Sequence, residues 1–290
     1  MITVAVKSKL VTPGVKYMLL STFWFALMNV MVKKLSYLPS MELVFFRCTV
    51  ASIIGFVLLK KQDVSWVGTN HKLLFLRGLF GTIALYTFFL TLKHMPIGTA
   101  VTIQYLSPVF TTIFAVYILR EKVKPIQWLF FLVSFIGVLV IKGFDARISG
   151  AMLAVGLFSS VFSALAYNMV RSLKQKEHPL VVVLHFQLFG AIAGAVFTLF
   201  DYQAPILTDW IYILLIGIVT QLGQYYLTKS LQAEKIAKVS ILNYLGIIYA
   251  LFFGWWLFDE HQHLSTLLGI FLVVGGVVIN ILIANKKNSA

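Results

Sequence analysis

The chain has 290 residues, of which 60% are hydrophobic and only 12% are charged, too little charge to cover the surface of a soluble protein of this length. A net charge of +14 would suggest nucleic-acid binding in a soluble protein, but here the basic residues are expected to flank membrane spans. Composition therefore excludes a separate soluble domain and predicts a polytopic membrane protein that binds no nucleic acid.

Apolar runs long enough to cross the hydrocarbon core recur along the whole chain. They predict ten spans, at residues 14–33, 41–60, 73–92, 97–119, 125–142, 148–171, 179–200, 208–228, 235–258 and 264–284. Barrel strands would be about half as long and would alternate in polarity. The predicted fold class is therefore all-α integral membrane, with an uncleaved first helix because no small-residue cleavage pattern follows it.

Lysine and arginine are divided unevenly between the two sets of loops. With the N-terminus inside, seventeen lie in inner loops and tails, and five lie in outer ones: Lys33, Lys34, Lys93, Lys142 and Arg147. The positive-inside rule then places both termini in the cytoplasm of a cell whose inner membrane holds the protein.

Polar residues inside the first three spans are candidates for a binding site. The first span carries Trp24 and Asn29. Arg47, in the second, costs about 2.5–3.5 kcal/mol on insertion scales, so it is expected either to bind a substrate carboxylate or phosphate or to pair internally with Glu42. Arg77 lies close to the cytoplasmic end of the third span, where snorkelling to the interface is favoured.

The stretch "IQYLSPVF", residues 103–110, places an amide and hydroxyls beside a proline within the fourth span. Pro108 removes one backbone hydrogen bond and clashes with the carbonyl of Gln104. Such exposed polarity is tolerated in a membrane only against protein or a water-filled cavity. Gln104 and Tyr105 are therefore predicted to line a central site; the alternative is a kinked helix bonded only to its neighbours.

The later spans carry a second group of polar residues. His185 and Gln187 lie on opposite faces of the seventh span, so one is expected to face the cavity; a buried histidine would relay protons or be a hydrogen-bonded structural residue. The spacing of Gln221, Gln224 and Tyr225 puts them on one face of the eighth span, which we expect to line the cavity.

The chain repeats itself at an offset of 139 residues. "TAVTIQYLSPVFTTIFAVYILRE", 99–121, aligns with "KVSILNYLGIIYALFFGWWLFDE", 238–260. The polar matches are Gln104 with Asn243, Tyr105 with Tyr244, Glu121 with Glu260 and, further out, Asn29 with Asn168. The glutamates end their spans and are expected to cap or pin the bundle ends; a gating role is the alternative.

Five spans per copy is an odd number, so the second copy enters the membrane from the opposite side. We therefore predict two inverted five-helix repeats, at 1–142 and 143–290, with a substrate site near the midplane between them. Asn243 and Tyr244 are expected to complete that site, and the spans carrying Asn29 and Asn168 to flank it.

The chain resembles the EamA type of the drug/metabolite transporter superfamily, whose members have ten helices in two inverted repeats. The resemblance covers essentially the whole chain and rests on "FFR" (45–47), "LRGLFG" (76–81), "YLSPVFTTIFAVYILREK" (105–122) and "LGIIYALFFGWWLFDE" (245–260). "SMELVFFRC" (40–48) followed by "LRGL" is most similar to the branch that holds S-adenosylmethionine transporters, with riboflavin transporters and animal organic-anion members nearby. The pair Arg77–Gly78 has no counterpart in the second repeat, where Ile216–Gly217 stands.

The predicted function is secondary transport of a small organic metabolite by alternating access. Arg47 and the aromatics suit a zwitterion, either an amino acid or a nucleoside-derived compound such as S-adenosylmethionine; organic anions and planar, riboflavin-like or drug-like compounds are alternatives. No phosphate loop, HExxH, GxSxG or Cys/His cluster is present, so no enzyme, cofactor or metal is expected, and the single cysteine, Cys48, excludes an internal disulfide. A membrane scaffold, a lipid-acting enzyme, a coupling proton or counter-substrate, and a monomer or homodimer stay open.

Overall fold

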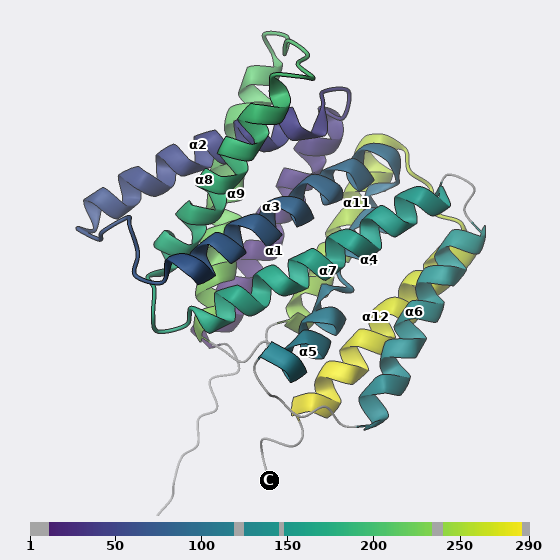
Figure 1. Cartoon of the computed structure of the whole chain (residues 1–290). Coiled ribbons are helices and arrows are strands. Elements are labelled where there is room, and N and C mark those ends of the chain that lie inside the picture. Colours follow the sequence, from purple (N-terminus) through teal and green to yellow (C-terminus); the bar gives the residue numbers. More distant parts are fainter. Residues whose placement is uncertain (1–11, 119–124, 145–147, 234–239, 286–290) are drawn as a thin grey trace, which may run out of the picture.

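The computed structural model describes residues 12–118, 125–144, 148–233 and 240–285, and these residues form an all-helical bundle (Figure 1). Its elements are α1 (Pro13–Lys34), α2 (Ser40–Lys61), α3 (His71–His94), α4 (Ile97–Gln104), α5 (Ser107–Ile118), α6 (Pro125–Phe144), α7 (Gly150–Ser172), α8 (Pro179–Thr198), α9 (Asp209–Ala233), η1 (Ser240–Tyr244), α11 (Leu245–Phe258) and α12 (Leu264–Asn285). With α4–α5 and η1–α11 each counted as one interrupted span, they give the ten spans expected. Seven are long and apolar enough to cross a membrane, and three are shorter apolar helices, so the all-α membrane fold is confirmed.

Helix packing follows the inverted repeat. The equivalent helices α2 and α8 pack on each other, as do α6 and α12, which lie side by side along one flank of the bundle (Figure 1). The pairs α1–α9 and α3–α7 are exchanged when each helix is replaced by its repeat equivalent. That exchange is what a twofold relation between two five-helix copies requires.

The fourth span is broken where the sequence predicts a kink. α4 ends at Gln104 and α5 begins at Ser107, because Pro108 cannot donate to the carbonyl one turn earlier. Hydroxyls of neighbouring elements donate to two carbonyls at this break: the Ser160 hydroxyl donates to the Ile103 carbonyl at 2.7 Å, and the Tyr244 hydroxyl to the Tyr105 carbonyl at 3.1 Å.

Glycines of α8 allow α2 and α8 to approach closely. A Cβ on Gly194 of α8 would lie 2.7 Å from the backbone of Phe45 in α2, and one on Gly190 would lie 2.6 Å from the Cys48 sulfur. This contact packs α2 against α8.

Glu177 ties two connections together at the end of the bundle predicted to be cytoplasmic. Its Oε1 accepts hydrogen bonds from the Thr69 amide at 2.5 Å, the Thr69 hydroxyl at 2.7 Å and the Asn70 amide at 2.6 Å. Burial acts to raise the pKa of this carboxyl, but the hydrogen bonds from Asn70 and Thr69 outweigh it and hold the pKa below its usual value. Asn70 caps α3 by accepting from the Leu73 amide, so the ionised carboxylate helps to fix the start of that helix.

Replacing Glu177 by glutamine is expected to lower the free energy of unfolding by about 1–3 kcal/mol near neutral pH, since charge-assisted hydrogen bonds are lost. A depressed folded-state pKa adds stability that is complete above the unfolded value, 4.5, and is lost as the pH falls through the folded pKa. Melting curves of the purified protein should therefore show a gap between wild type and E177Q that narrows below that pH. The exposed Asp63, replaced by asparagine as a control, should show no such gap, and a gap constant with pH would contradict the assignment.

Candidate functional site

A cavity of about 100 Å³ lies between the two repeats. Residues of α1, α2, α3, α4, α7, α8 and α9 line it, and none of these lining residues carries a carboxylate. Its polar lining residues are Asn29, Arg47, Arg77, Gln104, Tyr105, Ser163, Tyr167 and Gln224. A cavity therefore lies beside Gln104 and Tyr105, and its formal charge comes from two arginines.

Arg47 reaches the cavity from α2 and is only 1% exposed. Its Nε donates to the Thr220 hydroxyl at 3.0 Å, and its Nη1 has no partner in the described part of the chain. Phe89 and Phe186 flank the guanidinium, with ring centroids 5.8 and 5.7 Å from Cζ. The contacts of the Arg47 guanidinium are thus two aromatic rings and one neutral hydroxyl.

Of the two interpretations of Arg47, the internal pair with Glu42 is not formed. The Oε2 of Glu42 instead accepts from the Gln203 amide at 2.9 Å. Arg47 lies one to two turns further into the bundle, where its side chain joins the cavity lining. The guanidinium consequently has no carboxylate partner among the described residues.

Arg77 also faces the cavity, so the snorkelling interpretation is wrong. It is 3% exposed, its Cζ lies 4.1 Å from the Phe186 ring centroid, and its Nη2 donates to the Gln224 side-chain oxygen at 3.3 Å. The reason is Gly81, one turn deeper in α3: a Cβ there would collide with the Arg77 Nη1 and lie 2.7 Å from the Phe186 ring. Because Gly81 has no side chain, the guanidinium has room to lie inside the bundle instead of extending to the interface.

Gln104 combines both interpretations offered for it. It lines the cavity, and its amide is also held by α7: the Nε2 donates to Ser163 at 2.6 Å, and the Ser159 hydroxyl donates to the Oε1 at 2.8 Å. Such a fixed amide presents one orientation to whatever occupies the cavity.

The tyrosines matched by the repeat lie together. Tyr105 lines the cavity, and Tyr244 packs edge-on behind it with ring centroids 6.0 Å apart. Tyr244 donates to the Tyr105 carbonyl and is not itself among the lining residues, and neither is the half-buried Asn243. The second repeat supports the broken fourth span here and does not mirror it at the cavity wall.

Three predicted site amides bond one another or the backbone away from the cavity, and each keeps one buried polar atom without a partner among the described residues. Asn168 donates to the carbonyls of Thr111 at 3.2 Å and Ala164 at 3.0 Å. The Gln187 Nε2 donates to the Gln221 Oε1 at 3.0 Å, between α8 and α9. These amides pin helices to one another.

The remaining predicted residues also lie off the cavity wall. His185 bonds the Val181 carbonyl through Nδ1 at 3.0 Å, as a structural histidine would. The Tyr225 ring packs against Tyr226 and under the Lys229 ammonium, which lies 4.8 Å from its centroid, and Trp24 packs in the apolar core. Gln221, Gln224 and Tyr225 therefore do not share one cavity face, and only Gln224 of the three lines it.

Some lining residues were not anticipated from the sequence, namely Ser163, Tyr167, Phe186 and the aliphatic wall of α3. Phe186 had a signal: at the offset of 139 it is the repeat equivalent of Arg47. The equivalent positions of α2 and α8 thus meet across the cavity, one carrying a cation and the other an aromatic ring.

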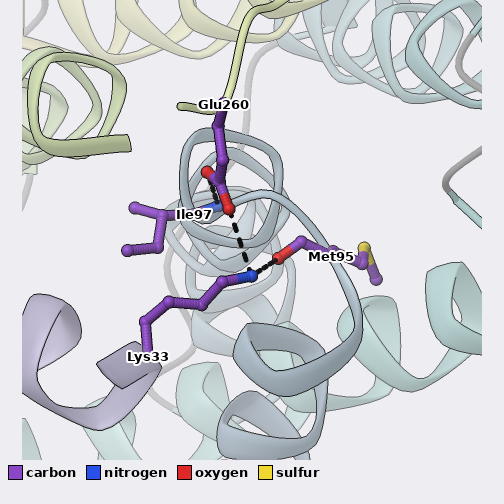
Figure 2. A network of polar contacts seen from close by, with 4 residues as sticks. All are labelled: Lys33, Met95, Ile97 and Glu260. Carbon is purple, nitrogen blue, oxygen red and sulfur yellow. Dashed lines mark hydrogen bonds and ion pairs between the residues drawn. The ribbon is translucent and has the colours of Figure 1, made fainter. Parts of the chain in front are cut away.

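Four residues form a polar network at the bundle end at which α1 terminates, the end predicted to face outward; we call them the outer cluster: Lys33, Met95, Ile97 and Glu260. Figure 2 shows Lys33 reaching from α1 to Glu260 and to the Met95 carbonyl. The Lys33 Nζ lies 3.1 Å from the Glu260 Oε1 and donates to the Met95 carbonyl at 2.6 Å, and the Ile97 amide donates to the Glu260 Oε2 at 2.7 Å. Glu260 therefore both caps α4 and pins the end of α11 to α1, while its repeat equivalent Glu121 lies outside the described residues.

Comparison with known proteins gives matches across the whole chain. The model of the EamA-like transporter family matches residues 12–143 and again 149–282. The pseudopaline exporter CntI of Pseudomonas aeruginosa is 29% identical over 268 residues, covering 91% of this chain and 94% of its own. The human solute carrier family 35 member G1 is 26% identical over 285 residues, covering 91% and 78%. A protein of known crystal structure shares the fold, with a TM-score of 0.68 at 18% identity over 94% of this chain and 97% of that one.

Proposed function

Since the chain belongs to the EamA-like transporter family, we propose that it is a secondary transporter that carries a small organic anion by alternating access at the central cavity. The observation that carries the proposal is the pair of buried arginines. Two guanidiniums line the cavity and no acidic side chain does. A buried charge left without a partner is costly, and an anionic cargo supplies that partner.

This choice favours the organic-anion alternative over a zwitterionic cargo. The ammonium of an amino acid, or the sulfonium of S-adenosylmethionine, would enter a cavity with two like charges and no carboxylate to receive it. A zwitterion is the second candidate because aromatic rings, including Tyr105 and Tyr167, also line the wall and attract cations through their faces.

The alternating-access part of the proposal rests on the fold. Two inverted halves that meet at a central site are the arrangement in which one half rocks against the other. The outer cluster supports a state closed on that side. We assign the halves to 1–142 and 143–290, a division that the two family matches support, and place both termini in the cytoplasm from the distribution of basic residues.

A thermal-shift screen of the purified protein in detergent tests the cargo class. Ligands that bind only the folded protein raise the melting temperature with the logarithm of their concentration. Organic acids should raise it, and amino acids, nucleosides and S-adenosylmethionine should not. Stabilisation by the zwitterions alone would overturn the anion assignment in favour of the second candidate.

A further inference from the structure

Resting on the proposed function, we infer that the cargo carries two separate anionic groups, as a short dicarboxylic acid does, one for each of the guanidiniums of Arg47 and Arg77.

The two arginines approach one another from opposite ends of the bundle. Arg47 lies about two turns from the start of α2 and Arg77 about two turns from the start of α3, and these helices run in opposite directions. Both guanidiniums converge on Phe186, whose ring centroid is 5.7 Å from one Cζ and 4.1 Å from the other. The distance between the two Cζ atoms therefore cannot exceed the sum of these two distances. A short molecule with an anionic group at each end can span such a distance.

Each guanidinium has N–H donors that form no hydrogen bond to the described residues. An arginine has five N–H donors, and the described residues give each side chain one neutral acceptor, Thr220 for Arg47 and Gln224 for Arg77. The Arg47 Nη1 and the Arg77 Nε are buried without any partner. Guanidinium forks suit the bidentate geometry of a carboxylate or phosphate oxygen pair.

Charge balance then sets the number of anionic groups. A cargo with one carboxylate would neutralise one arginine and leave the second buried and unpaired, which is the costly case. Two anionic groups neutralise both, and the fixed amide of Gln104 is left for a neutral polar part between them.

Matched pairs of ligands test this inference directly. Binding is measured by thermal shift and calorimetry for malonate, succinate, glutarate and adipate, each against its own monoamide, which differs by one charge. At least one diacid should bind about 10-fold or more tightly than its monoamide. In Arg77→Gln and in Arg47→Gln that ratio should fall to about one, and Arg77→Lys should recover part of it. Circular dichroism and gel filtration establish that the variants are folded.

Equal affinity within every pair, or a preference that survives in both glutamine variants, would overturn the inference and leave a monoanion transporter. Ethyl phosphate carries its charges on one group; binding as tight as that of the best diacid would overturn the requirement for two groups. If no member of the series binds, the inference falls, and if zwitterions bind in the same assay, the proposed anion transport falls with it.

Discussion

Replacing Arg47 by methionine is expected to stabilise the empty protein while removing its response to anionic ligands. Methionine removes a charge that the empty protein buries beside two phenylalanine rings and one hydroxyl. Exchanging buried ion pairs for apolar side chains of similar size is often neutral or stabilises by about 1–4 kcal/mol, and the Arg47 charge leaves no ionic partner behind when it is removed. The melting temperature of the ligand-free protein should rise by a few degrees, and the shift given by the best ligand should vanish.

Opposite signs for stability and binding distinguish a substrate-binding arginine from a structural one. Lys72→Met is the matched control because it removes one positive charge at an exposed position of α3, and it should change neither quantity. A lower melting temperature for Arg47→Met would indicate that the guanidinium holds the fold together, which would contradict its assignment to the cargo.

Neutralising Glu260 with glutamine is expected to open the outer end of the cavity. The change removes the ion pair with Lys33 and weakens the cap on the Ile97 amide. Both side chains are largely buried, at 15% and 11% exposure, so we expect about 2 kcal/mol, or a shift on the order of 30-fold toward the open state.

The shift can be followed by labelling a cysteine at Val101, which lines the cavity and is 1% exposed, in a Cys48→Ala background. Maleimide should react about 10-fold or more faster when Glu260→Gln is added. Asp259→Asn, the control, removes the neighbouring charge, whose side chain is 91% exposed and pairs with the exposed His261. Equal rates in the two variants would show that the outer cluster does not close the cavity.

The sequence predicts the fold well because span length, basic bias and the repeat are properties of whole segments. The broken span is equally local, since the ring of Pro108 acts on its own helix wherever the neighbours lie. The contact of Tyr105 with Tyr244 follows from the repeat, because an axis relating two copies brings equivalent residues at the centre together.

The side-chain directions were harder to predict, because they depend on partners from distant segments. Depth along α3 suggests that Arg77 reaches the interface, yet the gap at Gly81 and the ring of Phe186 turn it inward. Gln221 is as polar as Gln224, but its side-chain oxygen accepts a hydrogen bond from Gln187 of α8, away from the cavity. Asn168 does not line the cavity as its repeat equivalent Asn29 does, because its amide donates to nearby backbone carbonyls.

Arg47 and Phe186 occupy equivalent positions of the two repeats, so halves with the same fold contribute different chemical groups to the cavity. Both charged residues of the cavity wall belong to the first half, and the second contributes only neutral groups such as Ser163, Tyr167 and Gln224. Under the proposed binding mode, substitutions at these two positions of one half would change the cargo and would leave the packing of α2 on α8 intact.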